Sequence, residues 1–248
     1  MERIRACLEG SGIPVSDRQL EQLETYLQMV VEKNKVMNLT AITEREEFIE
    51  KHLLDSAAPL FASPELLRLF LPQGNDTKAG AVRLLDVGTG AGFPGIPLKI
   101  LCPSLSVTLL DSLRKRVDFL QEVIAALGLR DICAFHMRAE EGGRNAKLRE
   151  SFDLVVSRAV ANLSLLSEYD LPFVRIGGTF LAYKSGEIRE ELEQAGHAIR
   201  VLGGQAEEPV FLTLPGTEIQ RTFIPIQKKQ KTPKAYPRKP GSAKKDPL

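Results

Sequence analysis

Apolar residues recur along this chain with two different periods, and the change of period divides it into regions. Up to about residue 70 they follow helical spacing. One such series consists of Leu20, Leu23, Leu27, Val30 and Val31. From residue 81 onward, short apolar runs alternate with helical segments. The pattern predicts an N-terminal helical cap over residues 1–72 and an α/β domain over residues 81–227, joined by a polar linker that contains Pro and Gly.

The α/β domain is predicted to alternate strands with helices. We expect strands at residues 82–87, 106–110, 132–136, 152–157 and 177–183, and helices at residues 94–101, 113–127 and 187–195. Residues 199–202, 209–214 and 221–226 are also strand-like, and a Pro-Gly-Thr turn separates the last two. Two late strands joined by a short turn indicate an antiparallel hairpin on an otherwise parallel sheet. We therefore expect a Rossmann-like α/β fold with a mostly parallel, seven-stranded sheet and an antiparallel C-terminal hairpin.

Several helix ends in this pattern carry recognisable capping residues. Ser16 with Gln19, and Thr43 with Glu46, have the spacing of capping boxes. Asn38-Leu39-Thr40 interrupts the helical series of the cap, and Pro64 suits the first turn of a later helix. Asn162 is expected to cap the helix that follows the fourth strand.

The composition describes an ordinary globular protein in a reducing compartment. Of the 248 residues, 43% are hydrophobic, and no apolar run approaches the length of about 18 residues that a membrane span needs. The N-terminus lacks the apolar core of a signal peptide. The three cysteines are widely spaced, which argues against a disulfide framework and against a C-x-x-C metal site. We expect a cytoplasmic protein that is not bound to a membrane.

The net charge of +1 conceals an uneven distribution along the chain. Residues 221–248 hold nine Lys and Arg against one Asp, so the rest of the chain is acidic. A basic tail on an acidic body suggests a polyanionic partner such as nucleic acid, and a solubilising tail explains the charge equally well. Residues 228–248 have almost nothing to bury, so we expect them to form a disordered tail.

The richest stretch for chemistry is the glycine-rich run that follows the first predicted strand. Gly88, Gly90 and Gly92 permit a positive φ and a close approach of the backbone to a ligand. Dinucleotide sites use G-x-G-x-x-G, whereas here the spacing is G-x-G-x-G and Phe93 follows. Asp86, two residues before the first glycine, would repel a pyrophosphate and could pair with a cationic amino-acid group. The run resembles motif I of the S-adenosylmethionine (SAM) methyltransferases, although a glycine-rich turn without a ligand is the alternative.

Two further positions at strand ends could contact such a cofactor. Asp111 ends the second strand, 23 residues after Gly88, where an acid accepts hydrogen bonds from both ribose hydroxyl groups. It could also cap the following helix, and both roles can hold together. Ala139 and Glu140 follow the third strand, where they could contact the adenine edge. For Glu140, the residues alone favour the simpler role of an acid in a first helical turn.

The fourth and fifth strands end in cations. Arg158 lies where many N-methylases place an amide, and it could hold a carboxylate or an RNA phosphate bidentately. An ordinary salt bridge is the alternative. Lys184, at the end of the fifth strand, is a weaker example of the same placement. The three histidines have neither metal-ligand nor triad spacing, and Ser157 lacks a G-x-S-x-G context, so we expect no metal and no hydrolase site.

With these residues in view, the chain resembles the bacterial glucose-inhibited division protein B family, the small-subunit (16S) ribosomal RNA guanine-N7 methyltransferases. The resemblance covers roughly residues 1–227. It is carried, in the family's order, by Asn38-Leu39-Thr40, His52-Leu53-Leu54-Asp55-Ser56, the run from Leu85 to Leu98, the run from Leu110 to Arg116, Arg138-Ala139-Glu140-Glu141 and Ser157-Arg158-Ala159. The long G-T-G-A-G-F-P-G-I-P run followed by D-S-L-x-K-R is highly specific.

The resemblance implies a class I SAM-dependent methyltransferase and a set of cofactor-binding residues. With the glycine-turn residues singled out above, the cofactor set comprises Asp86, Gly88, Gly90, Gly92, Phe93, Asp111, Ser112, Leu113, Ala139, Glu140 and Arg158. Phe93 and Leu113 would flank the adenine. Arg158, Lys184 and Asn38 are candidates for placing the RNA.

The reaction that the resemblance implies is direct attack by guanine N7 on the methyl group of SAM, which requires no general base. We therefore expect no catalytic acid or base, a partner in 16S rRNA or the small ribosomal subunit, and a monomer. An NAD(P)-dependent oxidoreductase and a non-catalytic, SAM-binding ribosome-assembly factor are the alternatives.

Overall fold

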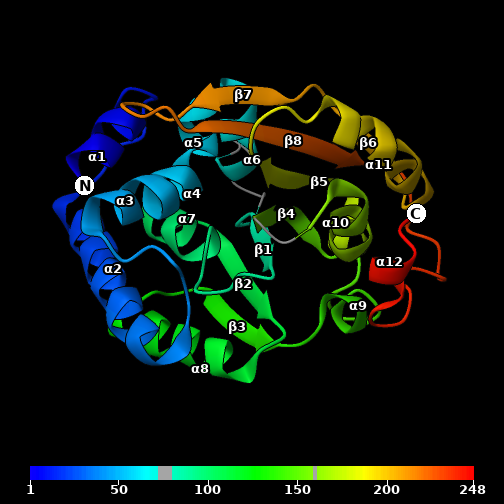
Figure 1. The fold of residues 1–248 in the computed structure, drawn as a ribbon, viewed down its shortest axis with the longest axis horizontal. Helices are drawn as coiled ribbons and strands as arrows, with labels where there is room; N and C mark the ends of the chain where they lie inside the picture. The colour runs from blue at the N-terminus through cyan, green and yellow to red at the C-terminus, as the bar shows by residue number, and fades with distance from the viewer. Residues whose placement is uncertain (72–79, 159–160) are drawn as a thin grey trace.

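The computed structural model describes residues 1–71, 80–158 and 161–248, and shows a central sheet with helices on both faces (Figure 1). The sheet has the strand order β3-β2-β1-β4-β5-β8-β6, and β7 also pairs with β8. Its strands are β1 (Arg83–Val87), β2 (Ser106–Asp111), β3 (Ile132–His136), β4 (Phe152–Arg158), β5 (Val174–Lys184), β6 (Gly204–Ala206), β7 (Val210–Thr213) and β8 (Gln220–Lys228). β1 to β5 are parallel and β8 is antiparallel to them, as the sequence pattern predicted.

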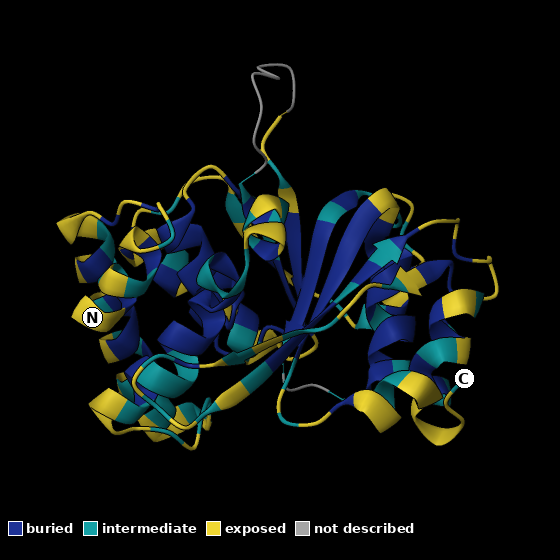
Figure 2. Cartoon of the chain, turned by 90° about the horizontal axis from the view of Figure 1, so that it is seen from above, coloured by how far each residue is buried: buried dark blue, intermediate teal, exposed yellow. Residues whose placement is uncertain are grey.

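Side-chain alternation along the strands divides the interior into two cores. In β1, Leu84 belongs to the core beneath the N-terminal helices, and Leu85 and Val87 belong to the core on the opposite face. Because successive side chains of a strand point to opposite faces, each layer of helices receives its own apolar surface. Figure 2 shows the buried sheet between these two layers. The parallel strands all end at one edge, and the loops that follow them meet there.

The helices fall into two groups. The first covers one face with α1 (Glu2–Glu9), α2 (Asp17–Met37), α3 (Arg45–Phe48), the π-helical turn Ile49–Leu54, α4 (Asp55–Ala57), α5 (Pro59–Ala62), α6 (Pro64–Phe70), α7 (Gly95–Leu101) and α8 (Arg114–Ala126). The second lies on the other side with α9 (Ala139–Gly142), α10 (Leu163–Asp170), the 3₁₀ turn Leu171–Phe173, α11 (Arg189–Val201) and α12 (Ser242–Lys245). Among the described residues, no helix is long and apolar enough to cross a membrane.

The N-terminal cap is fastened to the sheet domain by polar contacts as well as by its apolar core. Ser16 and Gln19 form the predicted capping box, and the Gln19 side chain also donates to the carbonyl of Ile100 at 2.8 Å. The Tyr26 hydroxyl donates to the carbonyl of Ala91 in the glycine turn at 2.8 Å. The second predicted box is wrong, because α3 begins after Glu44 without a side-chain cap. The predicted boundary between cap and domain stays a prediction, and most of its linker, residues 72–79, lies outside the described residues.

The far edge of the sheet differs from the predicted seven strands. Residues 1–71, 80–158 and 161–248 hold eight strands, because β6 and β7 occupy the same side of β8 one after the other, and the Glu207 N–H donates to the carbonyl of Pro225 between them. Pro209 has no N–H for the ladder, which interrupts this edge. The hairpin of β7 and β8 was predicted, whereas the strand expected at residues 199–202 is the end of α11 and its exit.

The C-terminal segment also differs from expectation, because residues 228–248 pack against the body instead of forming a disordered tail. Arg149 donates to the carbonyls of Thr232 and Tyr236, and Arg144 donates to the carbonyl of Pro237. Charge-assisted hydrogen bonds to main-chain carbonyls order a polar segment that has little apolar surface to bury.

Candidate active site

The glycine turn connects β1 to α7, and its conformation depends on three glycines. Gly88, Gly90 and Gly92 have φ values of 69°, 61° and 113°, as the sequence analysis expected. A Cβ on Gly92 would lie 2.6 Å from Cγ1 of Ile96 and 2.8 Å from the Tyr26 hydroxyl oxygen. The loop can therefore fold tightly against α7 and the cap while its outer side stays open to a ligand.

Asp86 organises this loop from beneath. It is fully buried, and its Oδ2 accepts hydrogen bonds from the Thr89 hydroxyl at 2.6 Å and the Gly95 N–H at 2.8 Å. Burial raises the pKa of the Asp86 carboxyl to about 6, against the lowering effect of these two donors. Its Oδ1 is buried without a partner among the described residues. Asp86 therefore shapes the loop through Oδ2, and its predicted contact with the amino-acid end of SAM stays a prediction.

Asp111 ties the ends of β1 and β2 together. Its Oδ2 accepts from the Gly90 N–H and its Oδ1 from the Leu113 N–H, each at 2.9 Å. Arg116 approaches the same carboxylate at 3.5 Å. Each carboxylate oxygen has two acceptor positions, so both remain able to accept from a ribose hydroxyl group. The predicted capping role is wrong, because α8 begins after Leu113 without a side-chain cap and Asp111 instead holds the turn that leads into it, and the ribose role stays a prediction.

A cavity of about 190 Å³ opens beside Asp111 and brings several predicted residues together. It is lined by Val87, Gly88, Leu110, Asp111, Ser112, Met137, Arg138, Ala139, Glu140 and Tyr169. Five of these, from Gly88 to Glu140, are among the predicted cofactor residues. Leu113 lies next to them with 51% of its surface exposed, an apolar side chain available to flank a ring. Sequence analysis missed Tyr169, because it lies in α10 with no motif around it.

Phe93 lies elsewhere, in an aromatic cluster beneath the cap. Its ring stacks on the His52 imidazole with 4.4 Å between centroids and 14° between planes, and it also contacts Tyr26 and Phe48. Phe93 is only 7% exposed, and it does not line the cavity beside Asp111. The structure therefore uses Phe93 to attach the glycine turn to the cap, and its predicted place beside the adenine stays untested.

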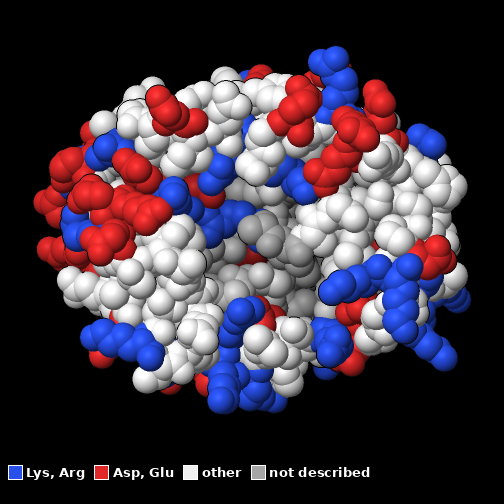
Figure 3. Space-filling view, viewed as in Figure 1, with Lys and Arg blue, Asp and Glu red and all other residues white. Residues whose placement is uncertain are grey.

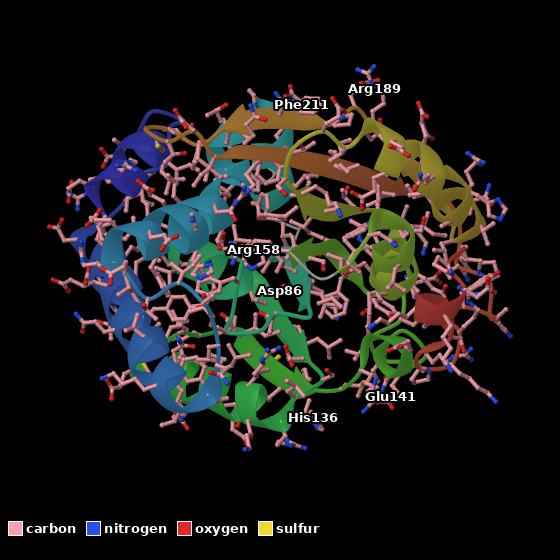
Figure 4. The ribbon with its side chains drawn as sticks, in the orientation of Figure 1. Asp86, His136, Glu141, Arg158, Arg189 and Phe211 are labelled. Carbon is pink, nitrogen blue, oxygen red and sulfur yellow. The ribbon has the colours of Figure 1, made fainter. Side chains whose placement is uncertain are left out.

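Arg158 is held at the end of β4 by the cap. Its guanidinium donates to the Asp55 carboxylate at 2.7 Å, to the Lys51 carbonyl at 3.0 Å and to Nδ1 of His52 at 3.2 Å. The same guanidinium lies over the Phe93 ring, 5.0 Å from its centroid. The salt bridge considered as the alternative for Arg158 is thus present. Figure 4 shows Arg158 and Asp86 at the centre of the strand-end face and His136 and Glu141 toward its rim.

Asp55 is the acceptor that sequence analysis did not single out. It is buried, and its second oxygen accepts from the guanidinium of Arg221 on β8 at 2.6 Å. One carboxylate therefore joins the cap to two strands of the sheet. The only available signal was its place in the His52 to Ser56 run, which carried the resemblance and named no partner.

A second cavity, of about 410 Å³, lies between the cap and the ends of β4, β5 and β8. It is lined by Ile42, Lys51, His52, Asp55, Arg158, Ala161, Tyr183, Lys184, Ser185, Glu191 and Arg221. Four Lys and Arg outnumber the two acids, and Lys184 pairs with Glu191 at 2.6 Å. The surplus of cations suits a polyanion. Arg158 and Lys184 are together here, whereas Asn38 is exposed at the left-handed end of α2 and does not line this cavity.

His52 in this second cavity is neutral. Burial and the Arg158 charge lower the pKa of its imidazole to about 3. Because an arginine can only donate, Nδ1 of His52 accepts from Arg158, and Nε2 therefore carries the proton that faces the Thr40 hydroxyl at 2.7 Å. Its basic nitrogen is occupied, so His52 cannot act as a general base in this arrangement.

The two cavities lie on either side of the point where the strand order reverses, between β1 and β4, which is where open α/β folds bind ligands. The residues around the smaller cavity fit SAM: a glycine turn that permits close approach, an acid at the end of β2 and a partly exposed Leu113. The fold and this site together define a Rossmann-like, SAM-dependent methyltransferase.

Comparison with known proteins identifies the family. Residues 19–220 match the family model described as rRNA small subunit methyltransferase G. The chain is 51% identical over 241 residues to Ribosomal RNA small subunit methyltransferase G of Lachnoclostridium phytofermentans, covering 97% of this chain and 94% of that protein. It is 46% identical over 248 residues to the protein of that name from Bacillus cereus (strain AH187), covering 100% and 98%. The chain belongs to the rRNA small subunit methyltransferase G family, as its motifs predicted.

A solved structure supports the fold alone. The citrinin polyketide synthase CMeT domain is similar with a TM-score of 0.53 and 16% sequence identity, over 71% of this chain and 52% of that chain.

The alignment with the Bacillus cereus relative spans the whole chain, so the C-terminal segment lies within it although the family match ends at residue 220.

Proposed function

We propose that this protein transfers a methyl group from SAM to N7 of a guanine in 16S rRNA of the small ribosomal subunit, acting in the cytoplasm as a monomer. The observation that carries the proposal is the cationic cavity that adjoins the cofactor cavity at the strand ends and has no free base among the described residues that line it. The names of the relatives support rRNA as the substrate.

The titratable groups of the larger cavity are all engaged. Asp55 is paired with two arginines, Glu191 with Lys184, and the basic nitrogen of neutral His52 with Arg158. SAM, when bound, supplies a methyl group on a sulfonium sulfur. Guanine N7 has an in-plane lone pair and no proton to lose, so it is an acceptor that needs no base. This chemistry matches a site whose acids and bases are already committed.

The residues then have distinct tasks. Asp111, Ser112, Ala139 and Glu140 hold the nucleoside end of the cofactor, and Gly88 to Gly92 let the backbone come close to it. Arg158 and Lys184 place the RNA near the strand ends, with Asn38 at the rim of the cap. Catalysis comes from holding N7 in line at attack distance and from excluding water.

The test is methyl transfer from labelled SAM to small subunits isolated from cells that lack this protein. We expect label in the small-subunit RNA and none in large-subunit RNA. Binding of SAM without any transfer would instead support the assembly factor, and protection against thermal unfolding by NAD(P) but not by SAM would support the oxidoreductase.

A further inference from the structure

The part of the C-terminal segment that follows β8, residues 229–248, is held against the body by acids and arginines of the body itself. The buried Glu168 of α10 accepts three hydrogen bonds from the Arg238 guanidinium, at 2.6, 3.0 and 3.1 Å, and one from the backbone N–H of Arg238 at 2.7 Å. Arg144 and Arg149 hold carbonyls of the same segment. Arg238 thus attaches the segment to α10, and these contacts together fix the path of the segment over the body.

That path brings the segment to the cofactor cavity. Starting from the end of β8, it returns toward the ends of the parallel strands, where the Gly241 N–H donates to Glu140 at 3.2 Å. Glu140 lines the smaller cavity, and so does Tyr169, the neighbour of Glu168. The segment also packs closely on Gly143, because a Cβ added there would lie only 2.9 Å from Cγ of Pro237. The segment therefore forms part of the wall next to the cofactor cavity.

The lysines at this end of the segment are not used by the fold. Lys239, Lys244 and Lys245 are exposed, and none has an ion pair with any described residue. Even exposed ion pairs are worth only about 0–1 kcal/mol, so an exposed lysine without a pair contributes little to stability. The charge of these lysines is available to a partner.

Cations from two other segments also lie at the edge of the sheet where the parallel strands end. Arg114 and Lys115 are exposed in the first turn of α8, which contains no acid of its own and where the helix dipole opposes positive charge. Arg138, exposed after β3, lines the cofactor cavity. In Figure 3, blue atoms gather along the lower and right rims of the central hollow, where α8, α9 and α12 lie in Figure 1, and red atoms crowd over α1 to α3.

We infer that Arg114, Lys115, Arg138, Lys239, Lys244 and Lys245 form a basic rim that docks the phosphate backbone flanking the target guanine. This inference rests on the proposed function and assigns the folded C-terminal segment to RNA docking. The rim holds six cations around the cofactor side of the site, while the acidic helices lie on the other side. The RNA backbone therefore crosses the enzyme on the side of α8, α9 and α12.

The test replaces three lysines of the segment, K239Q/K244Q/K245Q, and compares the variant with R18Q/R130Q/R200Q. The control arginines are also exposed and lie at the opposite ends of the strands: at the start of α2, just before β3 and in the last turn of α11. For the lysine variant we expect KM for small subunits to rise about tenfold at 0.15 M salt, with kcat at saturating RNA and SAM affinity unchanged. The plot of log affinity against log salt should become less steep by about 2 units of slope, since each lost phosphate contact removes roughly 0.7 to 0.9 from the magnitude of the slope. The control should match the wild type.

An unchanged KM and salt slope in the lysine variant, or equal effects in the control, would overturn the inference. A loss of SAM affinity with an unchanged RNA affinity would also overturn it, since the segment would then be structural. If the wild type bound RNA through the rim without transferring methyl, the proposed function would fail and the docking role would stand.

Discussion

Asp55 and Arg158 form the ion pair that joins the N-terminal cap to the sheet, with 2.7 Å between Oδ2 and Nη1. The two residues are 103 positions apart in the chain, and only 3% and 12% of their side chains are exposed. Because Arg221 binds the other oxygen of Asp55, the carboxylate fixes both guanidinium groups at the wall of the larger cavity. The pair therefore supports the fold and positions two cations of the site.

Replacing Asp55 with Asn should destabilise the fold by about 3 kcal/mol, because it leaves two nearly buried guanidinium groups without their counter-charge. Urea unfolding measures this change. Glu122→Gln is the matched control, since its ion pair with Lys33 is exposed and should contribute about 0.5 kcal/mol at most. Equal losses in the free energy of unfolding for the two substitutions would show that Asp55 does not join the cap to the sheet as we describe.

Arg158→Ala should reduce methyl transfer by about 100-fold while the protein stays folded, since it removes a cation from the larger cavity and takes the donor away from Nδ1 of His52 and Oδ2 of Asp55. Arg158→Lys should recover little of this activity, because one ammonium group cannot reproduce the three guanidinium contacts. Single-turnover kinetics with small subunits measures the rate, and Arg175→Ala, an exposed arginine paired with Asp153, is the control. Intact SAM affinity and intact transfer in Arg158→Ala would remove this residue from the account.

The close fit beneath the glycine turn predicts that Gly95→Ala weakens SAM binding by at least about tenfold. An added Cβ would lie 2.9 Å from Oδ2 of Asp86 and would collide with the Leu109 side chain. Equilibrium dialysis measures the affinity. Gly80→Ala is the control, because a Cβ there meets nothing within 4 Å. Unchanged SAM binding in Gly95→Ala would mean that the turn shifts freely to make room for the methyl group.

The buried Asp86 predicts a pH dependence of stability. Its pKa is about 6 in the folded protein, against 3.8 for an aspartate side chain in water, so the folded protein holds the proton more tightly than the unfolded chain. This group's contribution to stability is therefore lost as pH rises from about 4 to above 6, by roughly 3 kcal/mol in total. Asp86→Asn should gain stability relative to the wild type across that window. Thermal unfolding of both proteins between pH 4 and 7 measures it, and a constant difference would contradict the assignment.

The features that depend on residues close together in the sequence could be predicted from the sequence. The alternation of strands and helices, the bounds of β3 and the positive φ values of the glycine turn follow from residue periodicity and from glycine itself. The partner of Arg158 could not be predicted, because Asp55 is brought to it by the docking of the cap. Composition likewise failed for the C-terminal segment, whose order depends on hydrogen bonds to Arg144 and Arg149, about 90 residues earlier in the chain.

The most direct measurement of the central claim is the identity of the methylated nucleoside. Small subunits from cells lacking this protein are treated with the enzyme and SAM, and their 16S RNA is digested and analysed by mass spectrometry against nucleoside standards. We predict 7-methylguanosine, formed at a single position and lost in Arg158→Ala. Methylation on carbon, on an exocyclic amine or on ribose would contradict the account, because those acceptors lose a proton and require a base, which the described residues of the larger cavity do not offer.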